Sequence, residues 1–168
     1  IPDKPVLDQS MLLENYGSPS FYGPNSIAQT FKAGLTGPLS KIKFFLQRVG
    51  NPSNLIIDIC NVDDGKPGAT IYVSKEIPAL NISTSMTATL VTFHVPYEII
   101  KDTSYAIVLR TKSGTEDVSN RYSSYYVWDT EVDHYVDGTM CMSDNGGSLW
   151  TKNPNYTDIY FATYVFNF

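Results

Sequence analysis

The chain has 168 residues, of which 42% are hydrophobic and only 17% charged, and its formal net charge is −5 at pH 7. This length suits one domain with a full core, and an aromatic content of 13% argues against disorder. Nucleic acids and anionic membranes are bound through dense positive charge, so both are disfavoured as partners. No apolar run reaches the ~18 residues needed to span a bilayer, so membrane insertion is not expected.

Apolar and polar residues alternate along most of the chain, which predicts β-strands. An N-terminal strand and an aromatic loop are expected within residues 1–26, and the body of the same single domain over 27–168. Ile42, Phe44 and Leu46 share one face of an early strand, and Leu55, Ile57 and Ile59 repeat this pattern. Further extended runs are expected at 72–77, 90–95, 105–110, 122–128, 134–142 and 159–166.

Clusters of Gly, Pro, Asn and Ser separate these runs, at 34–38, 50–54 and 63–68 for example. Turns at such intervals are typical of antiparallel strands joined by short loops. No amphipathic helix of ten or more residues is predicted. The fold class is therefore all-β: an antiparallel β-sandwich of about eight to ten strands, with jelly-roll topology as the preferred arrangement.

The order of strands and turns resembles a known group of domains. The matching features are Gln29-Thr30-Phe31, the strand 42–47, the turn 63–68, the strand ending at Leu109, Ser148-Leu149-Trp150, and Asp158-Ile159-Tyr160-Phe161. The chain is similar in these features to the jelly-roll carbohydrate-binding modules of extracellular enzymes, surface proteins and phage tail proteins. The resemblance implies an extracellular, cell-surface or virion-surface location and leaves the ligand open.

The sequence lacks the common motifs of catalysis. The chain has no Gly-rich phosphate loop, no His-Glu-x-x-His and no Cys-x-x-Cys. Asp129, Glu131, Asp133 and Asp137 are the densest carboxylates, and like charges this close favour either a loop or a bound cation over one face of a strand. We therefore expect a protein that is not an enzyme, with a glycoside hydrolase as the third hypothesis.

Aromatic residues give the strongest functional signal. Both tryptophans and seven of the twelve tyrosines lie between Tyr122 and Tyr164. Sugar rings need flat aromatic groups for their C–H face and polar groups for their hydroxyl rim. The candidate carbohydrate-binding residues are Tyr126, Trp128, Arg121 and Asp129, followed by Tyr125 and Trp150. If Val127 points inward, Tyr126 and Trp128 point outward, whereas the reverse register buries Trp128.

Three further sites have two interpretations each. Trp150, at a loop edge, is either a ligand platform or a plug that closes the sandwich. Cys60 and Cys141 form either one disulfide or two buried free thiols. In the domains that the chain resembles, a structural calcium often lies where the first and last strands meet; Asp158 and Glu14, with Asp8 as a further option, are the candidate ligands. The alternative is that Asp158 caps a turn.

Two functions from different classes follow. The first is a non-catalytic carbohydrate-binding module that tethers a larger secreted or surface protein to a polysaccharide or cell-surface glycan, with no required cofactor. The second is a structural or adhesion module of a virion or cell surface whose aromatic residues contact protein partners, including other domains of its parent protein.

Overall fold

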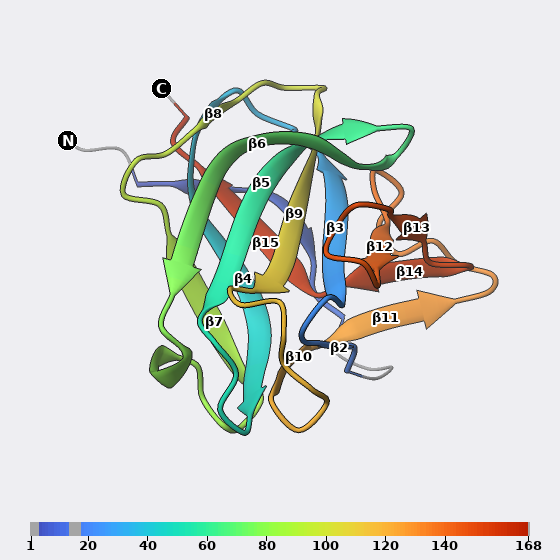
Figure 1. The fold of residues 1–168 in the computed structure, drawn as a ribbon. Helices are drawn as coiled ribbons and strands as arrows, with labels where there is room; N and C mark the ends of the chain where they lie inside the picture. Colours follow the sequence, from blue (N-terminus) through green and yellow to red (C-terminus); the bar gives the residue numbers. More distant parts are fainter. Residues whose placement is uncertain (1–3, 14–17, 168) are drawn as a thin grey trace.

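The protein is described by a computed structural model, which covers residues 4–13 and 18–167. Two antiparallel sheets face each other, and the chain crosses between them repeatedly (Figure 1). The fold is thus an all-β sandwich, as predicted. The described residues form fifteen strands instead of eight to ten, and three of them (β2, β8 and β13) are only two residues long.

The first sheet has seven strands. Their order is β1-β15-β4-β10-β2, and β7 and β8 also pair with the long strand β4. Their bounds are β1 Val6–Met11, β2 Ser20–Phe21, β4 Gly37–Val49, β7 Thr87–Thr92, β8 Glu98–Ile99, β10 Arg121–Ser124 and β15 Phe161–Val165.

The second sheet has six strands in the order β13-β12-β3-β9-β5-β6, and it faces the viewer in Figure 1. Their bounds are β3 Ser26–Lys32, β5 Leu55–Asp63, β6 Lys66–Ile77, β9 Ser104–Thr111, β12 Met140–Ser143 and β13 Thr151–Lys152. A separate two-stranded ribbon pairs β11 (Tyr126–Asp129) with β14 (Tyr156–Ile159). One 3-10 turn, η1 (Ala79–Asn81), precedes β7.

The core lies between the two sheets, and the alternation of the sequence determines which residues enter it. Ile42, Phe44 and Leu46 of β4 are fully buried, and so are Leu55, Ile57 and Ile59 of β5. Lys41, Lys43 and Gln47 lie on the outer face of β4 and are partly exposed. The predicted register of both strands is therefore confirmed.

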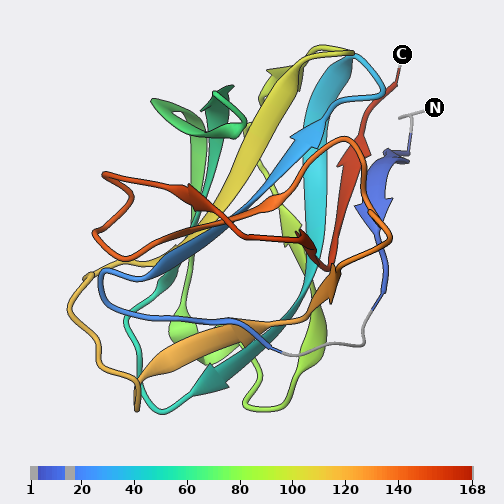
Figure 2. The ribbon, with the colours of Figure 1, turned by 90° about the vertical axis from the view of Figure 1, so that its right-hand side faces the viewer.

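The outer face of the six-stranded sheet is also partly covered. A second, small apolar cluster lies there, comprising Ala28, Cys60, Ala106, Val108, Cys141 and Trp150. The segment 144–150 runs across this face between β12 and β13 (Figure 2). Burial on both faces explains why the run Leu55–Cys60 is buried throughout, although its inward-facing residues alternate with outward-facing ones.

A polar clamp joins the two-stranded ribbon to the six-stranded sheet. Gln29, fully buried in β3, accepts a hydrogen bond of 2.7 Å from the backbone N–H of Ile159. Its amide nitrogen donates to Asp158 Oδ1 at 2.8 Å and to the Thr30 carbonyl at 3.1 Å. These bonds fix the base of β14.

Candidate functional site

The predicted aromatic residues lie mainly on the β11–β14 ribbon, which extends to the right in Figure 1. Val127 is fully buried and Trp128 is 44% exposed, so the register that turns Trp128 outward is confirmed. Tyr126 is only partly exposed and packs against the core. Tyr125 also packs inward, since its ring centroid lies 5.2 Å from that of Phe45.

The predicted polar partners of Trp128 lie on two different strands, Arg121 on β10 and Asp129 on β11. Arg121 pairs with Val49 near the end of β4, whereas Asp129 pairs with Tyr156 near the end of the ribbon. β10 and β11 belong to different sheets, and Tyr125 separates them in the chain. The binding site predicted from Arg121, Tyr126, Trp128 and Asp129 stays a prediction.

The side chain of Asp129 is occupied within its own loop. One oxygen accepts the Glu131 N–H at 2.9 Å, and the other lies 3.1 Å from His134 Nε2. The Glu131 N–H and the His134 ring lower the pKa of Asp129. In the described residues, no three His, Cys, Asp or Glu side chains gather closely enough to hold a metal ion.

The predicted calcium ligands Asp158 and Asp8 each accept a hydrogen bond from the protein itself. Glu14 lies outside the described residues. Asp158 is buried, accepts the hydrogen bond from Gln29, and has its pKa raised to about 7 by burial. Asp8 accepts the Gly34 N–H at 3.0 Å. The calcium site stays a prediction.

The two cysteines are separate buried thiols. Cys141 on β12 pairs with Ala28 on β3, Ala28 pairs with Val108 on β9, and Cys60 lies on β5 beyond β9. Three inter-strand steps of about 4.8 Å place their backbones roughly 14 Å apart. A disulfide needs Cα atoms within about 7 Å, so the disulfide alternative is wrong and the free-thiol alternative holds.

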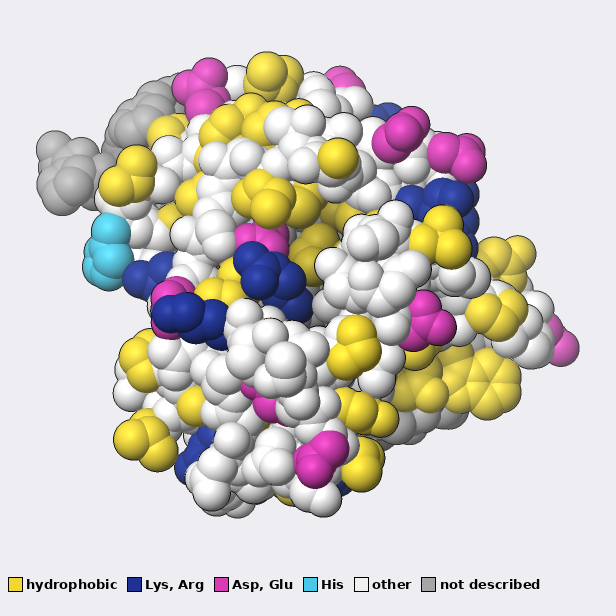
Figure 3. All heavy atoms as spheres, in the orientation of Figure 1, with side chains coloured by type: hydrophobic (Ala, Val, Ile, Leu, Met, Phe, Trp, Pro, Cys, Tyr) yellow, Lys and Arg dark blue, Asp and Glu magenta, His cyan; other side chains and the backbone are white. Residues whose placement is uncertain are grey.

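A groove that the sequence did not predict crosses the outer face of the six-stranded sheet. Three hollows of about 290, 150 and 230 Å³ follow one another and share lining residues. Trp150 and Gly147 line both the first and the second, and Arg110 and Gly146 line both the second and the third. We call this continuous depression the sheet groove. Figure 3 looks onto this face, with basic and acidic side chains together near its middle.

An ion pair lies in the middle of the sheet groove. Arg110 Nε donates to Asp58 Oδ2 at 2.7 Å, and Ser74 donates to the other Asp58 oxygen at 2.6 Å. The Asp58 side chain is only 3% exposed, whereas that of Arg110 is 35% exposed. The contact with Asp58 thus holds the guanidinium in place, and its two terminal nitrogens make no further hydrogen bond within the described residues.

Trp150 forms one wall of the sheet groove. It is 9% exposed and packs over the cluster that contains both cysteines. Burial raises the pKa of the Cys60 thiol to about 12, so this part of the floor is uncharged at neutral pH. The plug interpretation of Trp150 therefore fits its burial, while its remaining edge faces the groove.

The loop before Trp150 is shaped by its sequence. Gly146 and Gly147 have φ of +73° and +85°, which favours glycine at both positions. Ser143 Oγ accepts the Gly147 N–H at 2.9 Å, and Asn145 Oδ1 accepts the Leu149 N–H at 2.9 Å. These bonds hold the loop in place and so position the wall of the groove.

Glu116 anchors the loop at the other end of the groove. It accepts bonds from the Ser53 N–H at 2.9 Å, from Ser113 Oγ at 2.7 Å and from Thr111 Oγ1 at 2.7 Å. Burial alone would raise its pKa, but these bonds outweigh burial and lower the pKa to about 2. The Glu116 carboxylate therefore serves to hold the loop in place.

Comparison with known proteins adds a fold-level likeness. No family model matches the chain, and no curated protein does. Among solved structures, the chain is similar to the cysteine protease and lectin-like domains of Cwp84, a surface-layer-associated protein of Clostridium difficile, with a TM-score of 0.54 and 13% identity. The similarity covers 90% of this chain and 36% of that one. It supports a β-rich, lectin-like fold and is too distant to transfer a ligand. In the described residues, no helix is long and apolar enough to cross a membrane.

Proposed function

We propose that this domain is a non-catalytic carbohydrate-binding module of a secreted or surface protein, and that its glycan lies along the sheet groove. The observation that carries the proposal is the Arg110 guanidinium, which is held by buried Asp58, is partly exposed, and lines the same hollow as Trp150.

The groove offers both kinds of contact that a sugar needs. Ile71, which is 52% exposed, Val108 and the Trp150 edge supply apolar surface for the C–H face of a ring. The Arg110 N–H groups supply donors for hydroxyl oxygens. The groove is open along its length, which suits a chain of sugars and a modest affinity, because shallow sites recover little binding energy per contact.

Glycan-array screening of the purified domain, with and without calcium, tests the proposal, followed by titration of the best glycan. Arg110→Lys keeps a positive charge beside Asp58 but removes the planar fork, so we expect affinity to fall about tenfold or more. Trp128→Ala on the ribbon is the matched control and should leave affinity within about twofold. Loss of binding in Trp128→Ala alone would move the site to the ribbon, and absence of binding to every glycan would overturn the proposal.

A second function, that of an adhesion module, is favoured by the ribbon itself. Trp128, Tyr156, Val132 and Val136 are between 43% and 76% exposed on or near it. Exposed aromatic and aliphatic groups on a projecting element are typical anchors for a protein partner. Light scattering across a concentration series, with wild type and Trp128→Ser, tests whether that partner is a second copy of the domain: self-association that the substitution abolishes would support it.

A further inference from the structure

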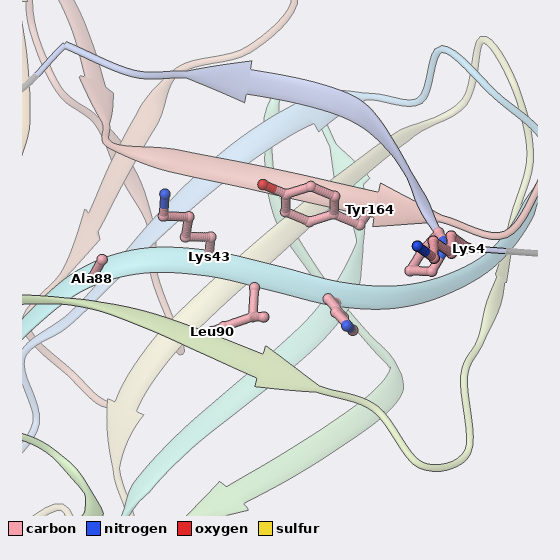
Figure 4. Close-up of a pocket in the computed structure, with 7 residues that line it drawn as sticks. Lys4, Lys43, Ala88, Leu90 and Tyr164 are labelled. Atoms are coloured by element: carbon pink, nitrogen blue, oxygen red, sulfur yellow. The ribbon is translucent and has the colours of Figure 1, made fainter.

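A second hollow lies on the opposite side of the sandwich, on the outer face of the seven-stranded sheet (Figure 4). Its volume is about 570 Å³, and its lining residues are Lys4, Pro5, Lys41, Lys43, Ala88, Leu90 and Tyr164. We call it the lysine hollow. Three of its seven lining residues are basic and none is acidic, although the chain as a whole carries 17 acidic and 12 basic side chains.

Strand register brings these residues together. Lys41 lies opposite Tyr164 of β15, and Lys43 lies opposite Leu90 of β7. Side chains two residues apart on a strand share one face and are roughly 7 Å apart, so the two lysines stand side by side. Figure 4 shows Lys43 and Lys4 on opposite sides of the Tyr164 ring. The positive charges are thus spread along the hollow and do not converge on one point.

The ammonium groups are not neutralised by the rest of the described structure. Ion pairs among the described residues involve other basic groups, and none includes Lys4, Lys41 or Lys43. Lys43 Nζ lies 6.0 Å from the centre of the Tyr160 ring, a contact that leaves its N–H donors available. Three unneutralised ammonium groups on one small surface repel each other, and an anion would relieve this repulsion.

The floor between the charges is apolar. Leu90 is 53% exposed, Ala88 is exposed, and Tyr164 is partly exposed. A small inorganic anion would use the charges and leave this floor uncovered. A ligand with a C–H face and with carboxylates repeated along its length would use both, because rings lie on Tyr164 and Leu90 while carboxylates reach the lysines.

We propose that the lysine hollow is a second binding site, for a carboxylated polysaccharide. The site is separate from the sheet groove, lies on the other sheet and does not depend on the function proposed for the groove. Together the two sites would allow one domain to bind glycans on opposite faces.

Titration calorimetry with polygalacturonate at low salt tests the proposal. The fully methyl-esterified polymer is the matched ligand control, because it keeps the sugar backbone and loses the charge. Dextran sulfate is the second control and reports on any affinity for polyanions in general. Binding to polygalacturonate that is absent with the ester, and that weakens as salt rises, is the expected result.

Two double variants that each remove two positive charges, one inside the hollow and one outside it, test where polygalacturonate binds. The double variant Lys41→Met and Lys43→Met keeps the apolar stems and should weaken polygalacturonate binding about three- to tenfold. The control is Lys32→Met with Lys101→Met, two exposed lysines outside the hollow, which should change affinity less than twofold. Equal loss in both double variants would reduce the effect to overall charge and overturn the site.

Three other outcomes would also overturn the proposal. These are equal binding of the esterified polymer, no binding of polygalacturonate, and binding of dextran sulfate alone.

Discussion

The β11–β14 ribbon and the sheet groove differ in how their residues are brought together. The ribbon takes its aromatic side chains largely from one stretch of chain, 125–129, and extends them in a line. The groove takes Asp58 from β5, Arg110 from β9 and Trp150 from the end of a long loop, and joins them by a buried ion pair and close packing. Residues close in sequence are thus displayed together along the ribbon, whereas those of the groove become neighbours only through strand pairing.

The largest expected difference concerns the ion pairs of the two regions. Arg110→Ala leaves the Asp58 carboxylate buried with only Ser74 as a side-chain partner, so we expect a loss of about 3 kcal/mol in the free energy of unfolding. His134→Ala breaks the more exposed Asp129–His134 pair and should lower the free energy of unfolding far less. Urea denaturation of each variant measures both values.

The double variant Asp58→Leu with Arg110→Met distinguishes the effect of the buried charge from that of the packing around the two side chains. It removes both charges and should regain much of the loss seen in Arg110→Ala. If the double variant is less stable than Arg110→Ala, packing around the two side chains matters more than the buried charge.

The next largest difference in stability is expected between substitutions of the two tryptophans. Trp150→Ala opens a cavity over the outer apolar cluster, and we expect a loss of about 2–3 kcal/mol. Trp128→Ala removes a side chain that is 44% exposed and should cost less than about 1 kcal/mol. Thermal unfolding at matched concentration is the measurement, and similar losses in both would contradict the different burial of the two rings.

The base of the ribbon should respond to pH. Asp158 has a folded-state pKa raised to about 7, above the ordinary value of 3.8, so its ionisation weakens folding as pH rises from about 4 to 7. Asp158→Asn cannot ionise. Between pH 4 and pH 8, we expect the free energy of unfolding of the variant to rise by about 2 kcal/mol relative to that of the wild type.

Urea denaturation at several pH values checks this gain. Asn keeps an oxygen that accepts from Gln29, so the clamp itself is preserved. A constant difference between the two proteins over this range would show that Asp158 keeps its charge state when the protein unfolds.

The smallest effect is expected at the end of the groove. Glu116 has a folded-state pKa lowered to about 2 from 4.5, so its stabilising contribution is present above pH 4.5 and is lost as pH falls toward 2. Glu116→Gln should lower stability by about 1 kcal/mol at pH 7, with the difference from wild type vanishing near pH 2. Stability curves for both proteins from pH 2 to 7 measure this convergence. Glu131→Gln, in the exposed ribbon loop, provides the control and should follow the wild type throughout.

Much of the fold could be predicted because period-two alternation reports burial directly. It placed Ile42, Phe44 and Leu46 in the core and assigned the antiparallel sandwich. The same rule left the register at Trp128 open, since aromatic residues suit either face of a strand. The number of strands was underestimated because two-residue strands such as β2 leave no periodic signal.

The sequence analysis did not predict the sheet groove, although two charged residues within or next to apolar runs point to it. Asp58 stands within the apolar run Leu55–Cys60, and Arg110 directly follows the run that ends at Leu109. A charge in a buried strand requires a partner, and this requirement could have paired the two. Their pairing depends on β5 lying next to β9, where Ile56 is opposite Arg110, and alternation alone does not give the order of strands.

The pairing of β1 with β15 determines how the domain responds to mechanical load. Val6 lies opposite Val165 at one end of this pair, and Met11 lies opposite Phe161 at the other. Tension applied through Val6 and Val165 would therefore open the rungs of the ladder one after another, as in a zipper, and would not shear them all at once. Since β1 is an edge strand, such peeling would begin far from β5, β9 and β12. The sheet groove would keep its shape while the ends of the domain yielded.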